Sequence, residues 1–329
     1  MISNGKFYES QFEEATIELL REAHWQYAFG DDIHRKYTDP LIEEDLRNFL
    51  AVQYKDKNLT TSEMDSIVAN LRNTGGQNDY YALRNTFLLY RDGYDFAYSD
   101  GRSNPFRLEY IDFEHPDHNI FRCVNQFVME QGRENRRPDI LLFINGIPVC
   151  IIELKNPTKQ NATIHDAHTQ ICTRYMRDIP ALLKYCALAV ISDGAKNALG
   201  ATYTPFEFFY EWKKIENEDK AGKGLDTLRT LIRGAISPER ILEILRDYFP
   251  DPTKEDDTTE IVCRYPQFFA TRKLRDHILN HLRSVGGDGK GGTYFGATGC
   301  GKTYTMLFLA RQLALRCRKQ LGSPTILII

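Results

Sequence analysis

Residues 137–157 read RPDILLFINGIPVCIIELKNP, and this stretch restricts the possible folds more than any other part of the chain. Two apolar runs flank Asn145-Gly146, a dipeptide that favours a two-residue hairpin turn because both positions tolerate positive φ. Short apolar runs bounded by turn signals are typical of buried strands. The stretch therefore predicts a tight antiparallel β-hairpin inside a protein core.

Three charged residues stand at the open end of this predicted hairpin. Glu153 and Lys155 are two residues apart, so their side chains leave the same face of a strand. The tight turn fixes the pairing and brings Asp139 across the hairpin to that end. Two carboxylates at the end of a buried sheet resist desolvation unless a cation or hydrogen bonds compensate.

Mg²⁺ would supply that compensation, because it is held by carboxylate oxygens together with waters and phosphate oxygens. Bound by Asp139 and Glu153, the ion would stabilise the charge that develops when a phosphodiester is attacked. Lys155 would orient or deprotonate the attacking water, or offset the charge of the phosphate. This interpretation makes the hairpin a nuclease site. A simpler alternative remains open, in which the carboxylates are solvated strand ends and Lys155 forms a salt bridge with one of them.

Pro138-Asp139, thirteen further residues and then Glu153-Leu154-Lys155 resemble the PD-(D/E)xK nuclease motif. Four other stretches extend the similarity: NQF at 125–127, YMRDIP at 175–180, ISDG at 191–194 and LIRGAISPERILEILRDYF at 231–249. Together they look like the endonuclease domain of a type I restriction enzyme R subunit (HsdR). The resemblance implies an α/β fold with a mixed sheet and flanking helices, and Mg²⁺-dependent cleavage of double-stranded DNA. It also implies assembly with a modification (methyltransferase) subunit and a specificity subunit.

The resemblance points to further site residues on the helix that follows the hairpin. The family often carries a Gln-x-x-x-Tyr pair there, whereas Gln170 and Tyr175 are five residues apart in this sequence. On a regular α-helix that spacing turns the second side chain away from the first. We expect both residues at the catalytic site if the helix is irregular, and ordinary helix-surface positions otherwise. Glu14, in an earlier predicted helix, is a candidate additional acidic residue, although a solvated helix position is the simpler interpretation.

Residues 293–303 read TYFGATGCGKT, which contains the full phosphate-loop pattern G-x-x-x-x-G-K-[ST]. A predicted strand at 293–295 and a predicted helix at 304–316 flank the pattern. Lys302 would neutralise the β and γ phosphates of ATP, Thr303 would ligate Mg²⁺, and backbone N–H groups would point at phosphate oxygens. The predicted ATP-binding residues are Gly296, Ala297, Thr298, Gly299, Cys300, Gly301, Lys302 and Thr303.

The resemblance to HsdR implies that this loop belongs to the first RecA-like domain of a superfamily 2 DNA translocase. Gln267 occupies a place where such motors often use a glutamine to read adenine, although a surface polar residue fits the sequence equally well. The apolar run 325–329 predicts a strand without a partner, so we expect the sequence to be an N-terminal piece of a longer protein. ATP hydrolysis and DNA translocation are not expected of this piece alone.

The order of the predicted elements indicates a compact α/β domain followed by a second domain. Helices are expected at 12–25, 41–52, 64–71 and 162–184, and at 225–248 with a break at Ser237-Pro238. Strands are expected within 106–128, at 187–192 and at 205–213. The acidic, proline-bearing stretch 250–260 is the best linker candidate. These features predict an endonuclease domain at 1–250, a linker at 251–260 and the start of the motor domain at 261–329.

Charge and cysteine usage limit the class of protein. A net charge of −3 and a pI of about 6.3 argue against DNA binding by overall basicity, so DNA contacts must be local. The run RENRR at 133–137 lies just before Asp139 and could supply them. The seven cysteines form no C-x-x-C pair, as expected for reduced thiols and not for a cysteine-based zinc site. With neither a signal peptide nor an apolar run of ~18 residues, a cytoplasmic location is expected.

Two other functions remain compatible with the sequence. A stand-alone helicase-nuclease of DNA repair would share both motifs. A catalytically inactive nuclease fold could serve instead as a DNA-binding or docking module. The histidine pairs His165/His168 and His277/His281 could hold a metal, but neither shows a third ligand in the sequence, so solvated helix faces are expected.

Overall fold

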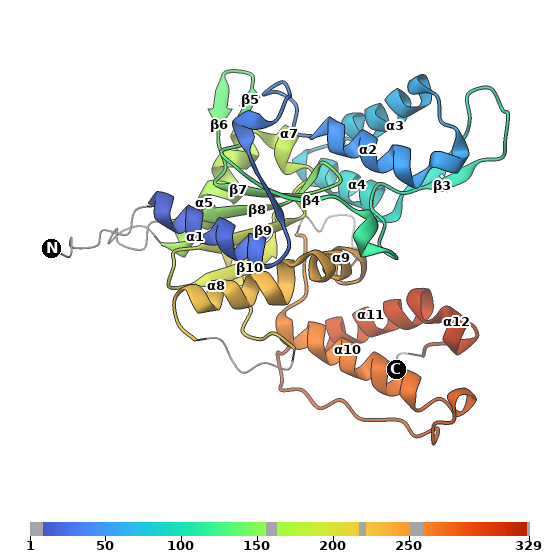
Figure 1. Ribbon diagram of the computed structural model, residues 1–329. Helices are drawn as coiled ribbons and strands as arrows, with labels where there is room; N and C mark the ends of the chain where they lie inside the picture. Colours follow the sequence, from blue (N-terminus) through green and yellow to red (C-terminus); the bar gives the residue numbers. More distant parts are fainter. Residues whose placement is uncertain (1–8, 156–162, 217–221, 251–258, 328–329) are drawn as a thin grey trace.

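A six-stranded mixed sheet forms the centre of the protein, as the computed structural model shows for residues 9–155, 163–216, 222–250 and 259–327 (Figure 1). The strand order is β1-β4-β7-β8-β9-β10, with β1/β4 and β8/β9 parallel and the other neighbours antiparallel. The strands are β1 (Gln26–Phe29), β4 (Phe121–Asn125), β7 (Ile140–Ile144), β8 (Ile147–Leu154), β9 (Leu188–Ser192) and β10 (Asn197–Ala201). Two small antiparallel pairs accompany the sheet: β2 (Tyr94–Phe96) with β3 (Phe106–Leu108), and β5 (Met129–Gln131) with β6 (Glu134–Arg136).

The predicted hairpin is present as β7 and β8. Asn145 and Gly146 have φ of 50° and 75°, as a two-residue turn requires. The Asn145 side chain is buried and accepts a hydrogen bond from the Ile120 N–H (2.8 Å). Ile42 N–H donates to the Gly146 carbonyl (2.9 Å). The turn is therefore fixed by neighbouring segments as well as by its own sequence.

A register shift inside the hairpin sets which residues meet at its open end. Ile144 pairs with Ile147 next to the turn. The pairing shifts by one residue between Phe143 and Leu142, so that Ile140 pairs with Ile152. Without the shift, Asp139 would lie across from Ile152. With the shift, extending the pairing by one residue beyond Ile140 and Ile152 places Asp139 beside Glu153. A β-bulge thus aligns the two carboxylates, in agreement with the frequent use of bulges to re-aim side chains near functional sites.

Helices cover both faces of the sheet, as the resemblance predicted. The face that carries Ile152 shares a buried cluster with a first group of helices, and the face that carries Ile151 shares one with the segment 164–183. The first group is α1 (Glu9–Glu22), α2 (Glu43–Gln53), α3 (Thr61–Asn73), α4 (Asp79–Asp92), α8 (Leu225–Leu231) and α9 (Pro238–Asp247). The second is α5 (Ile164–Thr169), a π-helix (Gln170–Tyr175), α6 (Met176–Asp178) and α7 (Pro180–Leu183).

The last part of the chain forms helices that lie together beneath α9, away from the sheet (Figure 1). These are α10 (Tyr265–Asn280), α11 (Lys302–Arg311), a π-helix (Gln312–Arg316) and α12 (Arg318–Leu321). Tyr248 joins them to the preceding region, because its ring lies 4.8 Å from that of Phe268 and 5.2 Å from that of Phe308. Aromatic packing thus connects this region to the sheet-bearing part of the protein.

Several predicted strands are wrong. Residues 293–295 and the described part of 325–329, residues 325–327, form no strand. A strand needs a hydrogen-bonding partner, and the surrounding described elements are helices. The predicted strand at 205–213 is instead a 3₁₀ helix (Phe206–Phe208), followed by a single bridge between Tyr210 and Leu199. Consecutive aromatic residues lack the alternation that a two-sided strand requires.

Other boundaries differ in detail. The predicted helix 162–184 is a series of short helical pieces, broken by Pro180. Helix α4 and strand β10 were not predicted. The linker predicted at 251–260 falls mostly on residues 251–258, outside the described residues. Across the described ranges, no helix combines the length and the apolar character that a bilayer crossing needs.

Candidate active site

Glu153 is the centre of a hydrogen-bonded cluster at the open end of the hairpin. It is the second-to-last residue of β8, and its side chain is 1% exposed. The Lys155 ammonium donates to Glu153 Oε1 (2.7 Å), and the Tyr175 hydroxyl donates to Glu153 Oε2 (3.2 Å). The acid and the amine that the sequence places two residues apart therefore lie on one face and touch.

Asp139 lies at the neighbouring strand end. Its Oδ2 accepts a hydrogen bond from the Leu154 N–H at 2.7 Å, which holds the carboxylate against the end of β8. Its charge also reaches Glu153. Burial, and after it the Asp139 charge, raise the pKa of Glu153 to about 8, and Lys155 opposes the shift only in part. At neutral pH the fold by itself thus favours a protonated Glu153.

A divalent cation fits this donor set. Two carboxylates that destabilise each other's charge at a buried strand end are the hard oxygen ligands that Mg²⁺ or Mn²⁺ prefers. A bound cation would return Glu153 to its charged form, because the attraction offsets both the burial and the repulsion from Asp139. The residues of the predicted metal site are therefore compatible with the predicted ion.

The π-helix explains the unusual spacing of Gln170 and Tyr175. It spans these two residues, and its hydrogen bonds join residues five apart instead of four. A five-residue spacing therefore keeps both side chains near each other: Gln170 Nε2 donates to the Tyr175 hydroxyl at 2.7 Å. Gln170 Oε1 also accepts from the Lys155 ammonium at 2.7 Å. Both residues reach the cluster that contains Glu153, through the kind of helix irregularity that the first of the two alternatives needed.

A second polar group lies beside the hairpin on helix α1 and strand β4. Glu14 is exposed, whereas its neighbour Glu13 accepts hydrogen bonds from Asn125 Nδ2 (2.7 Å) and Gln126 Nε2 (2.9 Å). Asn125 is the last residue of β4 and pairs with Ile140, the first residue of β7. Glu13 was not singled out from the sequence. The stretch NQF at 125–127 was the available signal, because its two amides need an acceptor.

The basic run before the hairpin divides into two kinds of arginine. Arg136 donates to Asp178 (2.7 Å) and Glu134 (2.6 Å), so its charge is balanced within the fold. Arg133 and Arg137 are exposed. The exposed pair is therefore the part of RENRR that can meet a charged ligand.

The phosphate-loop pattern is followed by a helix, as predicted, but residues 293–295 before it form no strand. Helix α11 starts at Lys302, and Gly299 and Gly301 both have φ of 78°. The Lys302 ammonium donates to the carbonyls of Gly296 (2.9 Å) and Ala297 (3.0 Å). Buried Gln267 donates to the Gly301 carbonyl (3.3 Å), beside a cavity of about 170 Å³. Gln267, the candidate adenine-reading residue, thus contacts the loop. Thr298 and Cys300 belong to the loop, and Thr303 lies in the first turn of α11.

Comparison with known proteins gives the family. The family described as "Type I restriction enzyme R protein N terminus" matches residues 6–208, which include the whole hairpin and the π-helix. The chain belongs to this family. The HindI type I restriction enzyme endonuclease subunit of Haemophilus influenzae is 30% identical over 336 residues, covering 98% of this chain. The EcoprrI endonuclease subunit of Escherichia coli is 32% identical over 200 residues, covering 58% of this chain and 59% of that protein.

The chain spans only part of its longer relatives. It covers 31% of the HindI subunit, and 32% of a related protein from Methanocaldococcus jannaschii. The matched region of the type I R protein family ends at residue 208, whereas the HindI similarity extends over nearly the whole chain.

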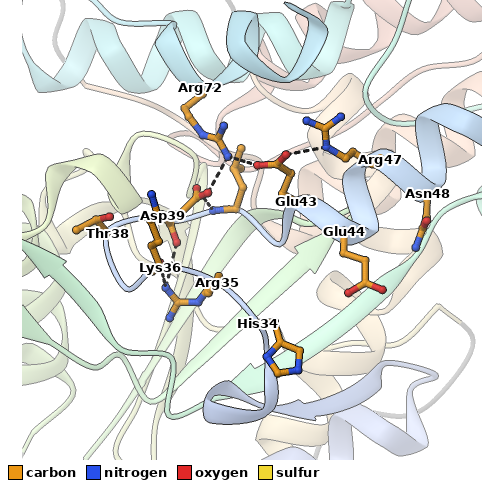
Figure 2. A pocket seen from close by; sticks show the side chains of 11 residues that line it. His34, Arg35, Lys36, Thr38, Asp39, Glu43, Glu44, Arg47, Asn48 and Arg72 are labelled. Carbon is orange, nitrogen blue, oxygen red and sulfur yellow. Dashed lines mark hydrogen bonds and ion pairs between the residues drawn. The ribbon is translucent and has the colours of Figure 1, made fainter. Parts of the chain in front are cut away.

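A separate cavity of about 740 Å³ in this family member lies between the loop 34–39, helix α2 and Arg72 (Figure 2). Arg72 bridges Asp39 and Glu43, each at 2.7 Å, and Arg47 donates to Glu43 at 2.7 Å. These guanidinium groups are neutralised by carboxylates of the cavity wall. The cavity is larger than the space beside the phosphate loop, but its paired charges indicate a structural role for these arginines. The hairpin remains the better candidate for chemistry.

Proposed function

We propose that this chain is the nuclease-bearing N-terminal part of the endonuclease subunit of a type I restriction enzyme, and that it hydrolyses phosphodiesters of double-stranded DNA. The observation that carries the proposal is the buried Glu153 carboxyl, in contact with Lys155 and beside Asp139. A buried acid with a raised pKa, close to a second acid and an amine, is a common feature of catalytic sites. The names of the family and of the HindI and EcoprrI subunits support the same activity.

Asp139 and Glu153 would hold Mg²⁺, which supplies Lewis-acid stabilisation of charge on the attacked phosphate and lowers the pKa of bound water. Gln170 and Glu153 both accept hydrogen bonds from the Lys155 ammonium, so they fix its position. From there Lys155 would offset the phosphate charge or assist the attacking water. Tyr175 would keep Gln170 and Glu153 aligned through its hydroxyl.

DNA would be held by local basic groups. Arg133 and Arg137 are exposed close to Asp139 in the sequence, and exposed guanidinium groups bind phosphate oxygens. Contacts with the backbone carry no sequence information. Sequence choice would therefore come from a specificity subunit, and the protein would assemble with this subunit and a modification subunit.

The phosphate loop would bind ATP for a DNA translocase whose remaining parts are outside this sequence. On ATP binding, the Lys302 ammonium would exchange its acceptors. Phosphate oxygens would replace the carbonyl oxygens of Gly296 and Ala297. In the complete subunit, Lys302→Ala is expected to abolish DNA-stimulated ATPase activity. Lys290→Ala, which removes another exposed lysine, is the matched control, and equal loss in both variants would contradict the assignment.

The nuclease proposal is tested by DNA cleavage with the assembled enzyme in Mg²⁺ and ATP. Asp139→Asn and Lys155→Gln should each reduce the cleavage rate by at least about 100-fold, the low end for loss of a catalytic acid, base or charge. ATPase activity should persist in both variants, because the phosphate loop is unchanged.

The control for Lys155 is Lys57, which also pairs with a carboxylate but lies on the surface beside Asp56. Lys57→Gln should cleave at the wild-type rate. Wild-type cleavage by both Asp139→Asn and Lys155→Gln would refute the nuclease site and favour an inactive nuclease fold that binds DNA.

A further inference from the structure

A loop far from the hairpin in sequence brings two histidines to one aspartate. Residues 112–118 read DFEHPDH, and they lead through a 3₁₀ helix (Pro116–His118) to strand β4. The side chains of Asp112, His115 and His118 place one carboxylate oxygen and two ring nitrogens within 4.8 Å of one another. Within the described ranges, no other such group of three ligand atoms occurs.

Both imidazoles face the same oxygen. Asp112 Oδ2 lies 3.3 Å from His115 Nδ1 and 2.9 Å from His118 Nδ1. The two rings are stacked, with centroids 4.8 Å apart and planes inclined by 23°. Ligand atoms about 2.0–2.2 Å from a tetrahedral ion are themselves separated by about 3.3–3.6 Å. The 3.3 Å separation between His115 Nδ1 and Asp112 Oδ2 falls in this range, whereas His118 Nδ1 at 2.9 Å is closer, so a bound ion would need the exposed His118 ring to move slightly outward.

The aspartate is held in place, while the histidines remain accessible. Asp112 is 4% exposed, and its Oδ1 accepts the backbone N–H groups of Glu114 (3.0 Å) and His115 (2.9 Å). Gln53 Nε2 donates to Oδ2 at 3.1 Å. The His115 and His118 side chains are 65% and 51% exposed. A fixed carboxylate under two accessible imidazoles allows an ion to enter from solvent.

We propose that Asp112, His115 and His118 form a binding site for a divalent transition-metal ion of the zinc class. Two imidazole nitrogens and one carboxylate oxygen suit Zn²⁺, Co²⁺ or Ni²⁺, whereas Mg²⁺ favours oxygen ligands. Three protein ligands leave a position for water or for a ligand from a partner. The site is independent of the magnesium site proposed at Asp139 and Glu153.

The ion would stiffen a contact between two parts of the protein. Glu114, between the ligands, accepts a hydrogen bond from Arg246 of α9 (3.2 Å), and Arg246 also donates to the Phe113 carbonyl (3.1 Å). Arg316, the last residue of the C-terminal π-helix, lies 3.8 Å from Glu114 and 3.0 Å from Asp247. A metal bound by this loop would thus stabilise the contacts of Phe113 and Glu114 with α9 and the C-terminal π-helix.

Equilibrium dialysis of the chain against Zn²⁺, with the bound metal measured by mass spectrometry, tests the site. The variant is His115→Asn with His118→Asn, in which asparagine can still donate a hydrogen bond to Asp112. The matched control is His277→Asn with His281→Asn, because those rings are only 3.9 Å apart but are not part of a three-ligand group. The wild type and the control should each bind one Zn²⁺ more than the variant.

Thermal unfolding supplies a second readout. Zn²⁺ should raise the melting temperature of the wild type and of the control, and raise it less in the variant. Each single substitution should weaken zinc binding by at least about 10- to 100-fold, the loss caused even by removing an outer-shell partner. If the double variant does not fold in the presence of chelator, the zinc affinities of the two single variants test the site instead. Equal zinc stoichiometry and affinity in wild type and variants, or loss in the His277/His281 control instead, would overturn the proposal.

Discussion

The hairpin and the phosphate loop differ in how much protein surrounds them. Every residue of β7 and β8 is buried, and the hairpin is paired on both sides within the sheet. In the described stretch 281–300, which leads into the phosphate loop, no residue is buried. The conformation of the hairpin is therefore supported by its neighbours in addition to its own turn sequence. The conformation of the loop depends on its own glycines and on the hydrogen bonds of Lys302.

Two glycines allow this difference to be measured. Gly146 and Gly299 have nearly equal φ, 75° and 78°, so alanine is strained at both positions. A Cβ on Gly146 would lie 2.1 Å from the Ile42 carbonyl oxygen, whereas one on Gly299 would meet nothing within 4 Å. Gly146→Ala should lower the free energy of unfolding by more than about 3 kcal/mol, because a packed backbone must move. Gly299→Ala should cost only the backbone strain, about 1–2 kcal/mol.

Chemical denaturation of both variants, monitored by circular dichroism, gives these values. The contrast between the two regions would be contradicted if the two substitutions were equally costly. A larger cost at Gly299 would show that the loop is enclosed by contacts that the structure does not have.

A more gradual effect, spread over several pH units, follows from the pH dependence of Glu153. Its folded pKa of about 8 lies above the ordinary value, so the fold favours the protonated form. The associated stability is complete at low pH, below the unfolded pKa, and is lost as the pH rises through the folded pKa. Between pH 5 and 8 this single group should reduce stability by about 1 kcal/mol per pH unit in the absence of divalent ions.

Glu153→Gln should remove that part of the slope and be more stable than the wild type at pH 8. Denaturation curves at several pH values in chelator provide the measurement. Glu243, whose pKa burial raises to about 7, contributes in both proteins and cancels in the difference. Identical slopes in wild type and variant would show that Glu153 is not desolvated as described.

The parts of the fold and site that the sequence predicted are those whose cause is local. Asn145-Gly146 determines its own turn, and the spacing of Glu153 and Lys155 fixes their common face. Helix α3, which contains the predicted helix 64–71, begins with a capping box formed by Thr60 and Glu63. These features required no knowledge of distant segments.

The features that escaped prediction depend on distant segments or on backbone irregularities. The β-bulge that aligns Asp139 with Glu153 is not encoded in a recognisable pattern, and a simple count from the turn pairs Asp139 with Ile152. The spacing of Gln170 and Tyr175 was compatible with an irregular helix but also with ordinary surface positions, so the π-helix itself was not predicted. Glu13 meets its partners Asn125 and Gln126 only in the folded chain. Asp112, His115 and His118 are close in sequence, but they converge only because the loop turns into the 3₁₀ helix Pro116–His118. The strand expected at 293–295 illustrates the opposite case. Its local sequence pattern favours a strand, but none forms because there is no partner strand among the described residues.

Titration calorimetry of Mn²⁺ binding to the chain tests the central claim most directly, namely that Asp139 and Glu153 together bind a divalent ion. At pH 7 Glu153 is largely protonated in the fold, so an ion that needs its carboxylate must displace a proton. Repeating the titration in buffers of different ionisation enthalpy measures that proton. The wild type should release close to one proton per bound ion at this site, and Glu153→Gln should lose both the release and most of the affinity. Equal binding by wild type and Glu153→Gln, with no proton released, would contradict the account.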